Sequence, residues 1–247
     1  MKSLIPIVLF LVSVGIIAQE PRDMEETKLT PAPTQEKGEE TKLAEEEKPA
    51  TENHFKFAFG LNYNSSNTAE ADLVYYDASA ARAFTGTAEF DVKSYASLEF
   101  EVRHMQKQNW GFTAGLSLGA ETEEQGGTIV LNGVTIVITS SADPDKMRVV
   151  LLYGNAVYRF DEVYIPFGLN VSAIDYKVAG GGAKIETEGG LGAQFGLGYQ
   201  FGDHVAFELL ARSIAFNVKF TDLATSDTTE YKDGHVTNLV LGAKYIF

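Results

Sequence analysis

The chain has 247 residues, a formal net charge of −14 and no cysteine. The acidity argues against a nucleic-acid partner, because phosphate backbones are bound by basic surfaces. Without cysteine there are no disulfides, no thiolate metal ligands and no cysteine to carry a lipid anchor.

The first 18 residues have the features of a secretory signal peptide. Lys2 precedes an apolar stretch from Leu4 to Ile17, and Ala18 offers a cleavage position. The stretch contains Pro6 and is shorter than the roughly 20 residues that a transmembrane helix needs. We therefore expect residues 1–18 to be a cleaved signal peptide, with an uncleaved membrane anchor as the alternative.

Residues 19–53 differ in composition from the rest of the chain. Acidic residues outnumber basic ones there, prolines recur, and aromatic residues are absent. Such a segment cannot bury enough apolar surface to offset the entropy lost on ordering. We expect a disordered acidic linker in the periplasm that serves as a solvated spacer, with a partner-binding tail as the alternative.

From residue 54 onward, apolar residues alternate with polar or small ones at period two, which is typical of strands. Eight segments show the pattern, at 55–63, 89–103, 110–119, 148–160, 163–172, 191–201, 205–218 and 238–247. Pro166 predicts a bulge or local irregularity in the fifth segment, because proline cannot donate to the ladder. In the seventh, Ile214 and Phe216 shift the apolar residues to even positions, which predicts a bulge near Ser213.

The connections between these segments alternate in length. Tight turns lie at 105–109, 161–162 and 202–204, and long polar stretches lie at about 64–88, 121–146, 174–189 and 219–235. Short turns on one side and long loops on the other are typical of transmembrane barrels. We expect the long loops to be extracellular, both chain ends to be periplasmic, and polar residues to face the interior.

The second long connection contains a local hairpin signal. Two apolar runs flank Asn132-Gly133, a dipeptide that favours the type I′ turn. We expect a self-contained loop hairpin. The alternatives are a hairpin that extends the third and fourth strand segments outward and an edge that adds a strand of a partner.

The last ten residues carry a family signature. Gly242, Tyr245 and Phe247 resemble the C-terminal insertion signal of bacterial outer-membrane barrels, from which Val240 departs. Residues 54–247 thus resemble the small eight-stranded OmpA-like, OmpX-like and OmpW-like barrels of Gram-negative bacteria. The resemblance implies an all-β fold, an eight-stranded antiparallel up-and-down transmembrane β-barrel after the linker. It also implies a monomer in outer-membrane lipid, inserted by the barrel-assembly machinery.

Charged residues of both signs fall on the inward positions of the expected strands. They are Lys56, Glu99, Glu101, Arg103, Arg159, Glu208, Arg212 and Lys244. Eight strands leave an interior that side chains can fill, and charges there must pair or keep water. We expect a lumen plugged by salt bridges, with a gate or ion path as the alternative.

Catalytic chemistry in such a barrel would need a histidine beside a hydroxyl or carboxylate. His54, His104 and His204 fall near the expected short-turn rim, and only His235, near Asp233, falls at the opposite rim. The chain has no Gly-x-Ser-x-Gly and no His-Glu-x-x-His motif. We expect no enzyme activity, metal or cofactor, and a structural or surface-interaction role. The alternatives are a narrow pore and a lipid-modifying barrel enzyme.

Overall fold

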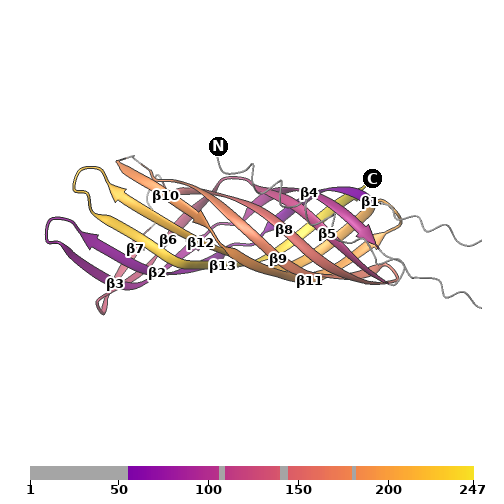
Figure 1. Cartoon of the computed structure of the whole chain (residues 1–247), viewed down its shortest axis with the longest axis horizontal. Helices are drawn as coiled ribbons and strands as arrows, with labels where there is room; N and C mark the ends of the chain where they lie inside the picture. The colour runs from indigo at the N-terminus through magenta and orange to yellow at the C-terminus, as the bar shows by residue number, and fades with distance from the viewer. Residues whose placement is uncertain (1–54, 106–108, 140–143, 180–181) are drawn as a thin grey trace, which may run out of the picture. The chain divides into compact units, whose positions relative to one another are not determined.

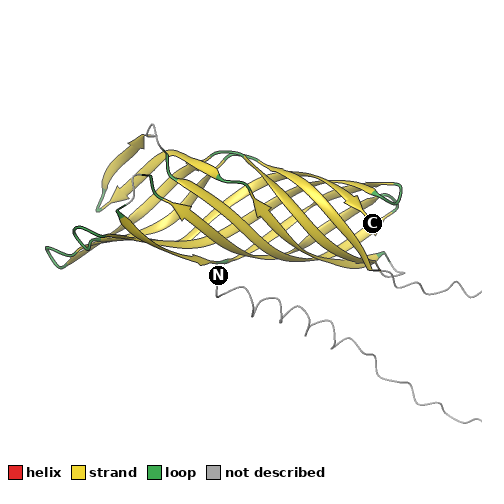
Figure 2. Cartoon of the chain, turned by 90° about the horizontal axis from the view of Figure 1, so that it is seen from above, coloured by secondary structure: helices red, strands yellow, loops and turns green. Residues whose placement is uncertain are grey.

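The computed structural model describes residues 55–105, 109–139, 144–179 and 182–247. The expected signal peptide and acidic linker, with His54, lie outside these residues. The described residues form strands and turns without helices (Figure 2). No helix in them is therefore long and apolar enough to cross a membrane.

The described ranges contain 13 strands, which curl around a long axis (Figure 1). They are β1 (Phe55–Asn64), β2 (Asn67–Asp77), β3 (Arg82–Val92), β4 (Tyr95–Met105), β5 (Trp110–Gly119), β6 (Thr122–Leu131), β7 (Val134–Thr139), β8 (Lys146–Phe160), β9 (Val163–Lys177), β10 (Ala183–Gly189), β11 (Leu191–Phe201), β12 (Val205–Asp222) and β13 (Thr228–Ile246). All belong to one sheet, and every pairing in it is antiparallel.

One series of pairings joins the longer strands. From β1 it runs through β4, β5, β8, β9, β11 and β12 to β13, and β13 pairs with β1 in turn. The remaining strands extend it toward one end, which we call the hairpin end. There β2 replaces β1 beside β13, and β3 pairs with β2 and β6. The opposite end, where β1 begins and β13 finishes, is the terminal end (Figure 1).

The long connections expected as loops are largely strands, so 13 strands lie in the described part of the chain where eight segments were expected. In the sequence these strands resemble loops because their alternation is inverted at the hairpin end, with polar residues outside and apolar residues inside. On β2, Glu70 and Asp72 are exposed while Ala69 and Leu73 are buried. A strand whose outer face meets water keeps its polar residues outside, so it does not resemble a lipid-facing strand.

The hairpin expected at Asn132-Gly133 is confirmed, but it is not self-contained, because β6 also pairs with β3 and β8. β6 and β7 pair from Leu131↔Val134 outward, and both turn residues have positive φ, 50° for Asn132 and 80° for Gly133. These values suit a type I′ turn. Pairing of β7 with β6 alone leaves the other edge of β7 unpaired among the described residues.

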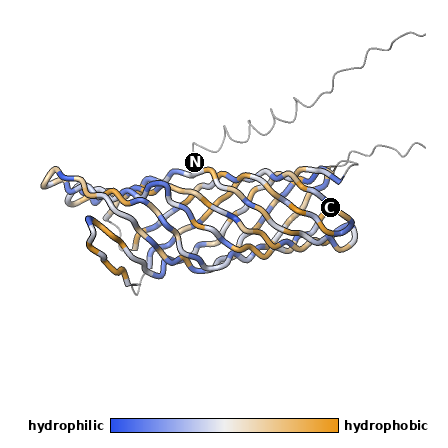
Figure 3. The backbone as a smooth tube through the Cα atoms, turned by 90° about the horizontal axis from the view of Figure 1, so that it is seen from below, coloured by the Kyte–Doolittle hydropathy of each residue, from blue (hydrophilic) through white to orange (hydrophobic). Residues whose placement is uncertain are grey.

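Along the strands near the terminal end, hydrophobic and hydrophilic residues alternate as expected (Figure 3). On β1, Phe57 and Leu61 are exposed while Asn62 is buried. At Pro166 the sheet has a local irregularity but no bulge: β9 pairs with β8 without a register shift, while its pairing with β11 skips Ile165 and Pro166. The bulge expected near Ser213 is wrong, because β12 pairs with β13 without a shift there. The shift lies instead between Phe216 and Val218.

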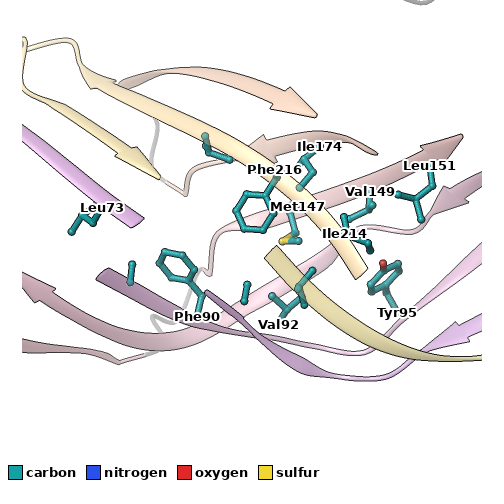
Figure 4. Close-up of a cluster of buried hydrophobic side chains, with 14 residues drawn as sticks. Leu73, Phe90, Val92, Tyr95, Met147, Val149, Leu151, Ile174, Ile214 and Phe216 are labelled. Carbon is teal, nitrogen blue, oxygen red and sulfur yellow. The ribbon is translucent and has the colours of Figure 1, made fainter. Parts of the chain in front are cut away.

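A hydrophobic cluster fills the buried face of the sheet toward the hairpin end (Figure 4). It gathers Phe90 from β3, Met147 from β8, Ile174 from β9 and Ile214 and Phe216 from β12. Ile214 and Phe216 therefore point inward, where the alternation in the sequence predicts an outward face. The buried face is thus apolar toward the hairpin end and polar in its middle.

Candidate functional site

Six charged side chains meet on the buried face in the middle of the sheet, and we call them the ionic layer. They are Glu99, Glu101 and Arg103 of β4, Glu208 and Arg212 of β12, and Lys244 of β13. Residues of the layer in the same strand are separated by two or four positions, which puts them on one face of that strand. Three carboxylates face three cations, so the formal charges of the layer balance.

Lys244 is the centre of the ionic layer. Its Nζ lies 2.6 Å from Oε1 of Glu99, 2.8 Å from Oε2 of Glu101 and 2.8 Å from Oε2 of Glu208. Gly60 lies between Glu99 and Lys244 in the ladders. Its absent side chain leaves room for both, because a Cβ there would lie 3.0 Å from Cγ of Lys244.

Each carboxylate that contacts Lys244 also contacts one of two arginines. Arg103 Nη2 lies 2.8 Å from Oε1 of Glu208, and its Nε donates to Glu101. Arg212 Nη2 lies 3.4 Å from Oε2 of Glu99, and its Nε donates to Gln194 at 2.8 Å. Every carboxylate of the layer therefore contacts at least two cations, which is the arrangement a buried charge requires.

Two tyrosines add neutral donors to the layer. Tyr153 OH lies 2.6 Å from Oε1 of Glu99 and 2.8 Å from Oε2 of Glu101, so its one proton is shared between them, and Tyr164 OH donates to Glu208 at 2.7 Å. Their side chains occupy space beside glycines: a Cβ on Gly115 would lie 2.4 Å from Tyr153 OH, and one on Gly198 2.1 Å from Cζ of Tyr164. The glycines therefore leave the space in which these tyrosines reach the charges.

We expect Gly198→Ala to lower the free energy of unfolding by about 1–3 kcal/mol, as for other overpacked sites. The added Cβ would displace the rigid Tyr164 ring and weaken its hydrogen bond to Glu208. Urea unfolding followed by the fluorescence of the single tryptophan, Trp110, measures the change. Gly154→Ala is the control, because a Cβ there meets nothing within 4 Å. Equal losses in both variants would contradict this role of Gly198.

Six of the eight charged residues predicted from the sequence meet in this layer, and two do not. Lys56 is exposed, and Arg159 donates through Nε to the carbonyl oxygen of Asp161. Both line a separate cavity of about 250 Å³ toward the terminal end, together with Arg103. The tyrosines of the layer were not predicted from the sequence, although alternation along the fifth segment puts Tyr164 on the inward face.

A larger cavity of about 490 Å³ lies toward the hairpin end, and we call it the chamber. Its wall is mostly apolar and aromatic, and includes Phe90, Met147, Ile174, Phe216 and Phe220. The volume lies in the range of small-molecule sites. Along β12 the chamber residues follow Arg212, so the ionic layer separates the chamber from the cavity at the terminal end.

Carboxylates interrupt the apolar wall of the chamber. Glu124 and Asp145 share the hydroxyl of Tyr176, which lies 3.2 Å from Oδ2 of Asp145. Burial raises the pKa of the Glu124 carboxyl, the Tyr176 hydrogen bond lowers it, and the charge of Asp145 raises it further. The overall effect is a Glu124 pKa above the ordinary value, because buried, like-charged carboxyls disfavour ionisation.

The three histidines within the described ranges do not gather into one site. His204 Nδ1 lies 2.9 Å from the carbonyl oxygen of Ile246, His104 stacks on Phe55, and exposed His235 lies 3.8 Å from Glu70. In the part of the chain that the structure describes, no three His, Cys, Asp or Glu residues are placed to hold a metal ion.

A comparison with solved structures matches outer-membrane proteins at low sequence identity. OprG from Pseudomonas aeruginosa is 14% identical with a TM-score of 0.48, over 78% of this chain and 95% of OprG. AlkL in lipid bilayers is 16% identical with a TM-score of 0.47, over 91% of this chain and 97% of AlkL. Ail of Yersinia pestis, solved with a heparin analogue, is 11% identical with a TM-score of 0.37, over 78% and 99%. No curated protein matches the chain.

The fold and its apolar exposed face define the class, an outer-membrane β-barrel protein. The family model for the outer membrane protein beta-barrel domain matches residues 47–247. The chain belongs to this family, and the outer-membrane location expected from its C-terminal signature is confirmed.

Proposed function

We propose that the protein is a non-conducting, non-enzymatic barrel that binds a small apolar molecule at its hairpin end. In this proposal the chain crosses the membrane eight times, because β1, β4, β5, β8, β9, β11, β12 and β13 each cross it once. The series of pairings that returns to β1 supports this count.

The outer surface supports an orientation. Toward the terminal end the exposed face carries large apolar residues such as Phe57, Phe100 and Leu197, which suit lipid. On β2 and β3 it carries Glu70, Asp72, Glu89 and Asp91, which suit water. We infer that the hairpin end projects outside the cell and that the linker and C-terminus are periplasmic.

The observation that carries the proposal is the ionic layer between two cavities. Its charges balance and its side chains are almost fully buried, so the lumen is blocked at this level in our proposal. An ion crossing the layer would have to separate buried ion pairs, which leaves uncompensated charges away from water. The chamber would then be a blind pocket open toward the hairpin end, which suits ligand binding rather than conduction.

Planar-bilayer recording and ligand titration test the two halves of the proposal. We expect no steady single-channel current from the protein, and little current from Arg212→Ala despite a large loss of stability. A stable current in the unmodified protein would make it a narrow pore.

We also expect phenylbutanol to bind by calorimetry, and Ala183→Trp to weaken that binding because Ala183 lines the chamber. Ala173→Trp, on the exposed face of β9, is the control.

A further inference from the structure

The chamber is apolar, yet its charged groups are all of one sign. Its wall includes Glu124, Asp145, Asp222 and Asp227, and within the described part of the chain no Lys, Arg or His lines it. None of the four carboxylates forms an ion pair with another described residue. The contrast with the ionic layer is sharp, because there each carboxylate contacts cations.

Neutral donors account for some of these oxygens. Asp222 accepts from the backbone N–H groups of Ala224 and Thr225, and Asp227 accepts from the N–H of Ala78, so both shape turns. Asp145 also accepts from a backbone N–H, that of Ala179, at 2.9 Å through Oδ1. Its Oδ2 shares one hydroxyl, that of Tyr176, with Oε2 of Glu124, and one hydroxyl proton cannot satisfy two carboxylates at once. Among the described residues this pair therefore has no compensating cation and a single side-chain donor between them.

Aromatic rings stand beside the carboxylate pair. Tyr176 packs against Phe220 at 5.3 Å between centroids, Phe220 against Tyr231 at 5.7 Å, and Tyr231 against Phe90 at 4.9 Å. All four line the chamber. Aromatic faces attract organic cations, and quaternary ammonium groups are the usual ligands of such aromatic cages.

We propose that the chamber is selective for small organic cations, in which an ammonium group is attached to an apolar body. The ammonium group would lie beside Glu124 and Asp145 against the aromatic rings, and the body would pack on Phe216 and Val218. This inference rests on the proposed function, since it needs a chamber that binds ligands. A weakly hydrated ammonium suits the site better than a metal ion, which the apolar wall could not coordinate.

Three probes with one phenylbutyl body test the selectivity by calorimetry. They are phenylbutyltrimethylammonium, phenylbutanol and phenylbutyrate. We expect the cation to bind about tenfold or more tightly than the alcohol, and the anion most weakly, because carboxylates and rings add to apolar contact only for the cation. The double variant Glu124→Gln/Asp145→Asn should bring the cation affinity down toward that of the alcohol, because only the contribution of the rings remains, and leave the alcohol affinity unchanged.

The control variant also removes two carboxylates at the hairpin end, but from the outer surface of the sheet instead of the chamber. Glu70→Gln/Glu89→Gln changes a cross-strand pair on the exposed face of β2 and β3 and should leave all affinities unchanged. Heat-modifiable gel mobility checks that each variant is folded. Equal affinity for cation and alcohol would overturn the inference and leave the chamber as a binding site. A cation affinity lowered only by the outer variant would also overturn it. Absence of binding by all three probes would overturn the proposed function itself.

Discussion

Replacing Lys244 by methionine should lower the free energy of unfolding by about 3–5 kcal/mol, the usual cost of removing one partner from a buried ionic group. Three carboxylates lie within 2.8 Å of its Nζ, and only two arginines would remain to compensate them. Methionine fills a similar volume, so the effect reports the charge rather than a cavity. Urea unfolding of the refolded barrel, followed by Trp110 fluorescence, measures it.

Two further variants separate burial from simple loss of charge. Lys244→Met/Glu101→Gln restores the balance of the layer and should lose less stability than Lys244→Met alone, which a double-mutant cycle quantifies. Lys232→Met removes an exposed partner of Glu230, 3.4 Å away, and should cost about 1 kcal/mol or less. If Lys244→Met costs no more than Lys232→Met, the layer is solvated and a water-filled pore becomes the better proposal.

Deleting Phe247 should strongly lower the amount of assembled protein in the outer membrane and raise its degradation in the periplasm. Phe247 completes the C-terminal signature that resembles the insertion signal, and its side chain is 68% exposed, free to be recognised. It also packs against Tyr245, with ring centroids 5.1 Å apart, and its N–H donates to the carbonyl oxygen of Phe57 at 2.8 Å.

The membrane yield and the heat-modifiable gel mobility measure assembly. Phe201→Ala is the matched control, because Phe201 is an exposed aromatic residue at the terminal end that lies outside the signature. We expect the control to assemble at nearly the normal level. Normal assembly of the deletion variant would show that Phe247 is dispensable for insertion.

Much of the fold near the terminal end follows from alternation in the sequence. The segment expected at 191–201 coincides with β11, and the C-terminal segment forms the last part of β13. The odd numbering of Glu99, Glu101 and Arg103 is enough to place all three on one face of β4. Side chains along a strand alternate with period two, so a residue can be assigned to a face wherever one face of the strand meets lipid and the other does not.

Alternation assigns a residue to a face of the sheet, but it does not say which residues of different strands lie side by side. Lys56 and Arg159 are close to strand ends, so they reach the cavity at the terminal end instead of the ionic layer. The register between neighbouring strands decides which charges meet, and register depends on pairings between residues distant in the chain. Lys244 and Glu101, for example, are 143 residues apart.

Alternation along the sequence also leaves open whether the apolar face of a strand turns inward or outward. A lipid-facing position for Ile214 and Phe216 would require a bulge, yet β12 keeps its phase there and directs both residues inward, with Phe216 lining the chamber. The sequence alone determined that segments from residue 55 onward form strands with one apolar face, because that pattern is local, although it missed the strands at the hairpin end. Only the tertiary structure decided that the apolar face turns inward at the hairpin end, because that depends on which surface meets lipid and which meets water.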